Sequence, residues 1–434
     1  MWYEMRQGQT RLVDLCQYMV RQPCEVLLAE GQQAPEQPGD SVVPVPFRAK
    51  KDPRELRILD PACGSGHFLL YSFEILLTIY EEAYADPQLG PALRKQFTGT
   101  PPVPDEEALA RFRLALPKLI VENNLHGIDI DLRATQIAAM ALWLRAHRAY
   151  CEMGIKIADR PRVTRSNVVC AEPMPGEQDL EEEFLGSLAR TELRDILRAI
   201  WKQMQLAGEA GTLLKVEREI QQAIDAVWRE WIARKSVVQM RLFEKGEPPA
   251  QQFFVFPSQE EKAFWDRAEA EVLAALREFA VRAADGRPYQ RRLFADDAEQ
   301  GMAFVDLLQN PFDVVLMNPP FGAASKPSKA YIDKAYPRTK NDLYAAFVER
   351  GLELLVPGGM LGAITSRTGF FLTSFRKWRE EILLKEAQLT TFADLGYGVL
   401  DTAMVETAAY CLLKPPAPPS GAEPANGTGP RENG

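Results

Sequence analysis

The feature that most constrains the fold of this chain is a short apolar strand that leads directly into a glycine-containing turn and a long helix. The strand is predicted at residues 57–60, the turn at 61–66 and the helix at 68–84. Glycine lets the backbone of such a turn adopt unusual φ angles and come close to a ligand. Strand–turn–helix units of this kind build parallel sheets that are covered by helices.

Further apolar strands alternate with helical stretches along the chain. Helices are predicted at residues 132–148 and 342–355, the second with Asp342 as its N-cap and the Pro-Gly-Gly of residues 357–359 as its stop. The other predicted strands are residues 125–130, 167–171, 312–317, 360–365, 389–395 and 407–413. This alternation predicts an α/β fold with a mainly parallel sheet.

Changes in composition divide the chain into five predicted parts. Residues 178–300 are poor in glycine and β-branched runs but rich in Glu, Arg, Ala, Leu and Trp, which favours a largely helical insertion. The final stretch is rich in Pro, Gly, Ala and Asn, which is typical of disorder. The parts are an N-terminal helical segment and linker (1–50), a cofactor half (51–177), the insertion (178–300), a catalytic half (301–414) and a disordered tail (415–434).

Composition excludes several classes of protein. The sequence has no apolar run that approaches the roughly 18 residues needed to span a bilayer and no signal peptide, so no membrane association and a cytoplasmic location are expected. Six scattered cysteines and three histidines argue against a metal site or a disulfide framework. The net charge of −9 argues against a uniformly basic nucleic-acid binder, although a local basic cleft is compatible with it.

The glycine turn is followed by an acidic strand end, and together they indicate an adenosyl-cofactor site. Gly64 and Gly66 lie in the turn, and Asp129 lies near the end of the next strand. A carboxylate at that point can accept hydrogen bonds from both ribose hydroxyls. Asp129 is alternatively a loop acid or a helix cap, and for Asp131 capping is at least as good an interpretation as ligand binding.

The Asn318-Pro319-Pro320-Phe321 tetrapeptide follows the most apolar strand and is the candidate catalytic motif. The amide oxygen of Asn318 and the carbonyl of Pro319 are two acceptors for the N–H bonds of adenine N6, and they would favour the positive charge that develops during methyl transfer. The prolines stiffen this pair, and Phe321 offers a face for stacking the base. The alternative is a proline turn that merely ends a buried strand.

A basic stretch follows the tetrapeptide at residues 326–340, where Tyr331 and Tyr336 lie among the cationic side chains. We expect it to form a loop that binds phosphates beside the target base, although a solvated surface loop is an equal alternative. Its cationic residues are Lys326, Lys329, Lys334, Arg338 and Lys340.

These motifs resemble those of gamma-type DNA adenine-N6 methyltransferases, which include type I and type IIG modification subunits. Residues 60–68 (DPACGSGHF) are similar to their cofactor motif, and residues 318–321 match their catalytic motif in the same order along the chain. Residues 341–347, 365–371 and 393–401 further resemble the methyltransferases of BREX phage-defence systems (PglX). This resemblance covers roughly residues 1–413.

The resemblance implies a Rossmann-like class I methyltransferase sheet of about seven strands, the last pair antiparallel, with S-adenosyl-L-methionine as cofactor and double-stranded DNA as partner. Glu172 is expected near the cofactor adenine unless it is an ordinary loop carboxylate, and His67 is expected to be a turn residue. The residues assigned to the cofactor by the resemblance are Asp60, Pro61, Ala62, Cys63, Gly64, Gly66, Asp129, Ile130 and Glu172.

The chain departs from this family at both ends, because it lacks the family's Thr-Pro segment near the N-terminus and the large C-terminal target-recognition region. We therefore expect a fragment or one half of a split protein that binds duplex DNA weakly by itself. Such a chain would need the missing region or other phage-defence subunits as partners for site-specific methylation.

Two rival functions remain compatible with the sequence. A glutamine-N5 protein methyltransferase can use the same Asn-Pro-Pro-aromatic device on a planar amide, although its glycine turn usually differs and it lacks a large helical insertion. The chain is alternatively a cofactor-binding defence subunit that is inactive without partners. Neither the target sequence nor a nuclease motif is evident.

Overall fold

The computed structural model of this chain describes residues 1–16, 19, 21, 24–32, 43–45, 47–99, 103–176, 178–188, 191–218, 278, 288–400 and 405–416. The predicted tail beyond residue 416 and the middle of the predicted insertion (219–277 and 279–287) lie outside these residues, as does most of the predicted N-terminal linker.

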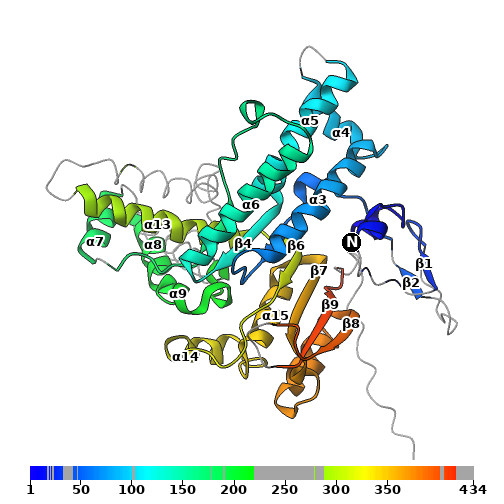
Figure 1. Cartoon of the computed structure of the whole chain (residues 1–434). Coiled ribbons are helices and arrows are strands. Elements are labelled where there is room, and N and C mark those ends of the chain that lie inside the picture. The colour runs from blue at the N-terminus through cyan, green and yellow to red at the C-terminus, as the bar shows by residue number, and fades with distance from the viewer. Residues whose placement is uncertain are drawn as a thin grey trace, which may run out of the picture.

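A seven-stranded sheet forms the centre of the molecule, with strand order β5-β4-β3-β6-β7-β9-β8 (Figure 1). Strand β9 is antiparallel to both neighbours, and all other pairs are parallel. The α/β class, the seven strands and the antiparallel pair are therefore confirmed. The strands are β3 (Ile58–Asp60), β4 (Leu125–Asp129), β5 (Asn167–Cys170), β6 (Phe312–Met317), β7 (Leu355–Ser366), β8 (Gln388–Gly396) and β9 (Thr407–Leu413).

Helices cover both faces of the sheet and bury two separate clusters of apolar side chains. On one face α3 (His67–Ala85), α5 (Asp105–Leu119) and α6 (Leu132–Glu152) share a core. On the other face the core joins helices of the insertion to α15 (Leu343–Leu354) of the catalytic half. The described residues of the predicted insertion contain α7 (Gln178–Ser187), α8 (Thr191–Met204), α9 (Ala207–Ala210), the 3-10 helix η4 (Gly211–Leu213) and most of α13 (Pro288–Gln309).

The central strands are positioned by their register. Ile58 and Leu59 of β3 pair with Leu125 and His126 of β4 on one side and with Val314 and Val315 of β6 on the other. Because the three strands are parallel, their carboxyl ends meet at one edge of the sheet. The glycine turn, the acidic end of β4 and the tetrapeptide after β6 all leave the sheet at this edge.

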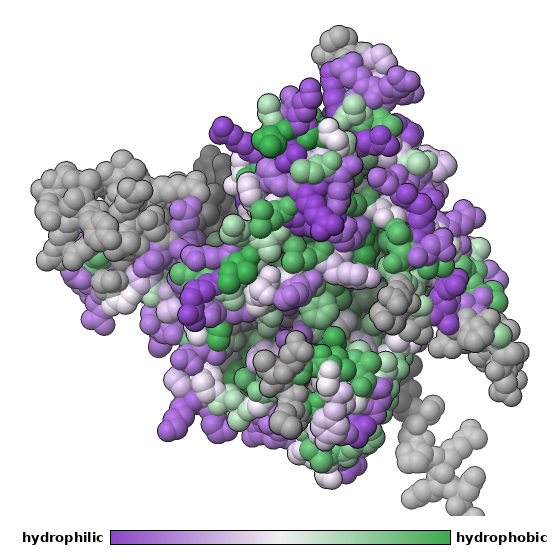
Figure 2. Space-filling view, viewed as in Figure 1, coloured by the Kyte–Doolittle hydropathy of each residue, from purple (hydrophilic) through white to green (hydrophobic). Residues whose placement is uncertain are grey.

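The outer face of α6 carries an apolar stripe. Ile137, Met140 and Leu144 follow helical spacing and are half or more exposed. Figure 2 shows apolar side chains gathered over this part of the molecule, whereas the projection formed by α4 (Gly90–Thr98) and α5 above it is mostly hydrophilic.

The N-terminal region differs from the prediction in one respect. The predicted helices are the single turns α1 (Trp2–Met5) and α2 (Leu12–Leu15). The predicted linker contains β2 (Val43–Val45), which pairs in parallel with β1 (Glu25–Leu27). The β-branched valines on either side of Pro44 favour this extended pairing over a free loop.

Two local predictions in the catalytic half were wrong. The basic stretch predicted as a loop is the helix α14 (Lys326–Ala335) followed by a turn, because the Ser325 hydroxyl caps the helix by accepting from the Ser328 amide. The Pro-Gly-Gly of residues 357–359 lies within β7, which begins directly where α15 ends. In the part of the chain that is described, no helix is long and apolar enough to span a membrane.

Candidate active site

The glycine turn between β3 and α3 is held in shape by its own backbone. The Cys63 amide donates to the Ile128 carbonyl of β4 at 2.9 Å, and the Gly66 amide donates to the Cys63 carbonyl at 2.8 Å. Gly66 has a φ of 86°, and a Cβ there would lie 3.0 Å from the Cβ of Ala138, so a larger residue would clash with α6. Gly64 has a φ of 51°, and a Cβ there would meet no atom within 4 Å. The turn is therefore packed on the Gly66 side and open on the Gly64 side.

Asp129, at the end of β4, ties the glycine turn to the next loop. Its Oδ2 accepts a hydrogen bond from the Gly64 amide at 2.8 Å, and its Oδ1 accepts one from the Asp131 amide at 3.0 Å. A carboxylate has about four lone-pair positions, so each oxygen can accept a further bond from a ligand hydroxyl. Asp131 itself caps α6 through the Arg133 amide, so capping is the correct interpretation of that residue.

Asp60 is the most deeply buried acid of the site. Its side chain is almost inaccessible and accepts one bond, at 3.2 Å, from the Ala62 amide. Burial raises the pKa of its carboxyl to about 8, and the negative charge of nearby Asp129 adds to this effect. A cation placed against these two carboxyls would relieve both the desolvation and the repulsion.

The other predicted cofactor residues surround this turn. Pro61 and Cys63 are buried, and Ala62 is half-buried. Ile130 is 53% exposed, and Glu172 follows β5 as a half-buried residue at the same edge. His67 begins α3 with its ring 3.2 Å from the Ser65 hydroxyl, so it stays a turn residue in our interpretation. Within the described ranges no group of three or more His, Cys, Asp or Glu residues has the arrangement of a metal site.

The tetrapeptide leaves the sheet beside the glycine turn because β6 is the parallel neighbour of β3. Asn318 is exposed, Pro319 is buried and Pro320 is exposed. Phe321 is half-buried, with its ring in an edge-to-face contact with Tyr344 at a centroid distance of 6.0 Å. The Asn318 amide is thus accessible, and the residues after it are anchored.

This anchoring is completed by Asp342, which the sequence identified only as a helix cap. Its Oδ1 accepts from the Gly322 amide at 2.8 Å and from the Tyr344 amide at 3.3 Å. The Gly322 carbonyl accepts in turn from the Leu343 amide at 2.8 Å. The residue directly after the tetrapeptide is therefore docked onto the N-terminus of α15.

The basic residues do not form one uniform patch. Lys326, Lys329, Lys334 and Lys340 are exposed, with Lys329 also 3.5 Å from Asp333.

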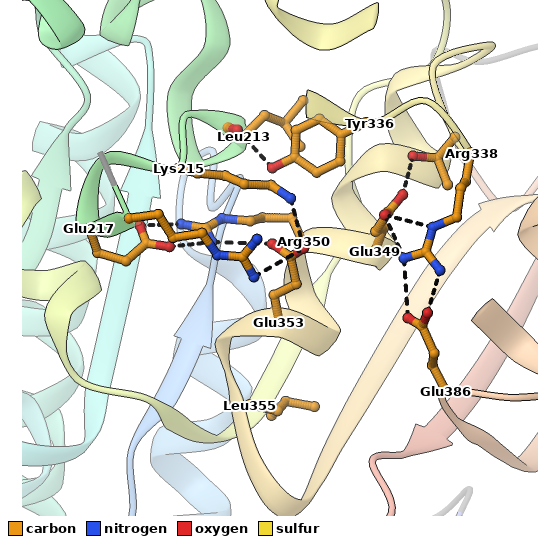
Figure 3. Close-up of polar contacts among 12 residues, drawn as sticks. Leu213, Lys215, Glu217, Tyr336, Arg338, Glu349, Arg350, Glu353, Leu355 and Glu386 are labelled. Atoms are coloured by element: carbon orange, nitrogen blue, oxygen red, sulfur yellow. Dashed lines mark hydrogen bonds and ion pairs between the residues drawn. The ribbon is translucent and has the colours of Figure 1, made fainter. Parts of the chain in front are cut away.

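Arg338 is instead bound by Glu349 at 2.7 Å and by Glu386, as Figure 3 shows. Tyr336 is fully buried and donates to the Leu213 carbonyl, and the hydroxyl of Tyr331 accepts from the Lys215 amide. Arg338 and the two tyrosines thus make contacts within the protein. Their positions among the lysines in the sequence gave no indication of these contacts.

Thr212 is a site neighbour that the sequence did not indicate. It lies in the insertion, about 150 positions from the glycine turn, yet its hydroxyl donates to the Pro61 carbonyl at 2.7 Å. A lone threonine in a helical region gives no signal for such a contact.

The sequence matches the models of two families of DNA-modifying methylases. The model of the Eco57I restriction-modification methylase family matches residues 123–399, more than half of the chain. The model of the DNA-methyltransferase domain of MmeI matches residues 48–168.

Two curated relatives match most of this chain. The adenine-specific methyltransferase BrxX of Escherichia coli O9:H4 (strain HS) is 24% identical over 409 residues, which cover 89% of this chain and 27% of BrxX. The adenine-specific methyltransferase PglX of Lacticaseibacillus casei (strain Zhang) is 24% identical over 392 residues, which cover 88% of this chain and 25% of PglX. The chain thus spans about a quarter of the length of these relatives.

Solved structures also match at low identity. A DrdV–DNA complex is 12% identical with a TM-score of 0.34, and the match covers 83% of this chain and 24% of that one. The M protein of the type I restriction enzyme EcoKI is 11% identical with a TM-score of 0.31, covering 84% of this chain and 40% of that one. On the family match over more than half its length, the chain belongs to the Eco57I restriction-modification methylase family.

Proposed function

We propose that this chain binds S-adenosylmethionine and transfers its methyl group to the exocyclic N6 of adenine in DNA. The observation that carries this proposal is the adjacency of two motifs: the exposed Asn318 follows β6, whose parallel neighbour β3 leads into the glycine turn. Membership of a restriction-modification methylase family and two relatives named adenine-specific methyltransferases support the choice of substrate.

The residues around the glycine turn fit this cofactor. The open space at Gly64 lets a ligand lie against the backbone, and the half-buried Asp129 has free lone pairs for ribose hydroxyls. The buried Asp60 carboxyl suits a ligand that carries positive charge, because its own environment disfavours an unpaired anion. Ile130 and Glu172 are proposed to border the adenine ring.

The cofactor supplies an electrophilic methyl group on a sulfonium sulfur. The work of the protein is to hold the target amine in line with that group and to stabilise the charge that the amine acquires. The Asn318 amide oxygen and the Pro319 carbonyl are the proposed acceptors for the two N6–H bonds, and Phe321 is the proposed stacking surface. Since the N6–CH₃ bond forms as the S–CH₃ bond breaks, one N6 proton is then lost to solvent.

A base inside a duplex cannot reach such a site, so we propose that the adenine is flipped out. Lys326, Lys329, Lys334 and Lys340 are the proposed phosphate contacts. Arg338 is left out of this set, because its guanidinium is already bound by two glutamates. The proposed biological role is the marking of host DNA in the cytoplasm for phage defence or restriction-modification, together with further protein regions or subunits.

The decisive experiment supplies S-adenosylmethionine with a labelled methyl group and three acceptors. These are duplex DNA that contains adenine, the same duplex with 2-aminopurine in place of adenine, and a peptide-release factor as a glutamine substrate. We expect label in the first duplex alone, as N6-methyladenine. Label in the release factor would refute the proposal. Absence of label from both DNA and protein, even after partner regions are added to the assay, would refute it as well.

A further inference from the structure

Residues 211–217 of the insertion lie between the two halves of the candidate site, and we call them the bridging segment. Its first six residues are buried, and Glu217 is half-buried. A Cβ on Gly211 would lie 2.9 Å from the Cγ2 of Ile130, so the segment also packs against the loop after β4. An insertion with no role in the site would be expected at the periphery, whereas this segment contacts two predicted cofactor residues.

Thr212 uses both of its polar groups to join the two halves. Its hydroxyl donates to the Pro61 carbonyl at 2.7 Å, which is the carbonyl at the start of the glycine turn. Its own carbonyl accepts from the Nε of Arg350, in α15, at 2.9 Å. Thr212 is fully buried, so water cannot replace either bond at no cost.

Charged and aromatic groups fix the rest of the segment to α14 and α15. Arg350 is 1% exposed and makes two parallel bonds of 2.7 Å to the Glu217 carboxylate (Figure 3). Lys215 contacts Glu353 at 2.7 Å and lies 4.4 Å from the centre of the Tyr336 ring. A planar, bidentate pair of this kind fixes orientation as well as distance.

The same helix α15 holds the residue that follows the tetrapeptide. Asp342 at its N-terminus binds the Gly322 amide, and Arg350 two turns later binds Thr212. The contacts therefore run from the tetrapeptide through Gly322, Asp342, α15 and Thr212 to Pro61. The described contacts thus place one hydroxyl group at the junction between this helix and the glycine turn.

We propose that Thr212 is a positioning residue: its hydroxyl holds the glycine turn in register with α15, and thereby sets the methyl donor against the target amine. This inference rests on the proposed function for its consequence in catalysis but not for its effect on the turn. Errors of about 1 Å in such placement can slow a reaction about 100-fold, so the rate should be sensitive to a buried contact that aligns the glycine turn with α15.

The test compares Thr212→Val, which keeps the shape and removes the hydroxyl, with Thr212→Ser, which keeps the hydroxyl. Thr135→Val is the matched control, because Thr135 is also buried and its hydroxyl bonds only within α6, to the Leu132 carbonyl. Hydrogen–deuterium exchange is measured at the amides of Cys63 and Gly64, and the Kd for S-adenosylmethionine is measured by calorimetry.

We expect Thr212→Val alone to speed exchange at these amides and to raise the Kd about tenfold, the factor that corresponds to about 1.4 kcal/mol. The methyl-transfer rate at saturating cofactor and DNA should also fall, whereas the Kd for DNA should not change. If Thr212→Val does not fold, Arg350→Lys carries the test, because it keeps the charge beside Glu217 but loses the Nε bond to Thr212.

Unchanged exchange at Cys63 and Gly64 in a folded Thr212→Val protein would overturn the inference. Equal effects from Thr212→Ser or Thr135→Val would overturn it as well, since they would indicate general loosening. A wild-type protein that binds no S-adenosylmethionine would instead refute the proposed function. The exchange measurement would still test the contact between Thr212 and the glycine turn.

Discussion

The glycine turn after β3 and the tetrapeptide after β6 leave the same sheet edge but are held in different ways. The turn is fixed from within the cofactor half by backbone bonds to β4 and by the Asp129 carboxylate, with one bond from Thr212. The tetrapeptide begins with the exposed Asn318 and is anchored at its other end, where the Gly322 amide binds Asp342, the N-cap of α15. The cofactor region is thus preorganised by its own strands, and the catalytic region depends on a helix that follows it in the chain.

The largest effect is expected from Asn318→Ala. Because Asn318 is exposed and contacts the target amine in our proposal, its loss should lower the methyl-transfer rate about 100- to 1000-fold. The Kd for S-adenosylmethionine, measured by calorimetry, should stay within about twofold. A variant that still methylates adenine at a near-normal rate would remove the tetrapeptide from the mechanism.

Asp129→Ala should weaken cofactor binding strongly and lower the methyl-transfer rate little, which is the reverse of Asn318→Ala. It leaves the Gly64 amide and the ribose hydroxyls without an acceptor. The binding free energy of S-adenosylmethionine should therefore weaken by about 1–3 kcal/mol, which raises its Kd about 5- to 150-fold. The rate at saturating cofactor should change much less. Unaltered affinity would contradict the ribose role, and a matched Asp131→Ala variant should affect mainly the stability of α6.

Asp60 predicts a pH dependence of cofactor binding. Its pKa is about 8 in the free protein, so its carboxyl is mostly neutral below that pH. If the cationic cofactor binds the ionised form, its affinity should rise about tenfold from pH 6 to 7 and about fivefold from pH 7 to 8. Calorimetry at three pH values checks this slope, which Asp60→Asn should abolish.

The same raised pKa has a consequence for folding. The folded state holds this proton more tightly than the unfolded chain, so Asp60 contributes stability below about pH 4 that is lost as the pH rises towards 8. Asp60→Asn should therefore flatten the fall in melting temperature between these values. An equal fall in both proteins would show that other groups control it.

Asp342→Ala should have an intermediate effect on the catalytic half alone. The loss of the cap and of the Gly322 contact should cost about 1 kcal/mol of stability and slow methyl transfer about fivefold, without a change in the cofactor Kd. Asp342→Asn keeps an acceptor oxygen and should retain most of the rate. Single-turnover rates at saturating substrates would distinguish the two variants. A higher Kd for S-adenosylmethionine in Asp342→Ala would contradict the separate anchoring of the two motifs.

The smallest effects belong to the exposed lysines. Replacement of Lys326, Lys329, Lys334 or Lys340 by Gln should weaken DNA binding severalfold each. The slope of log affinity against log salt concentration should become shallower by about 0.9 per lost phosphate contact. Arg338→Gln should leave that slope unchanged but lower stability by about 1–3 kcal/mol, because buried Glu349 loses a partner. An Arg338 variant with a reduced salt slope would mean that the guanidinium leaves its glutamates to bind DNA.

The sequence alone determined the order along the chain of the seven central strands and the location of the two motifs. The strand at Phe312–Met317 and the cap at Asp342 were predicted correctly, because apolar runs and capping residues are local signals. The seven strands and the antiparallel pair were expected from the family resemblance, since local signals do not specify how strands pair.

Only the tertiary structure decided which polar groups meet. Lys340 and Arg338 look equivalent in the sequence, yet Arg338 lies against Glu349 and Glu386, which come from α15 and from the segment before β8. Thr212 reaches Pro61 from about 150 positions away. Such contacts depend on how α14, α15 and the insertion pack against the sheet, because a side chain finds its partner by proximity in space and not by spacing along the chain.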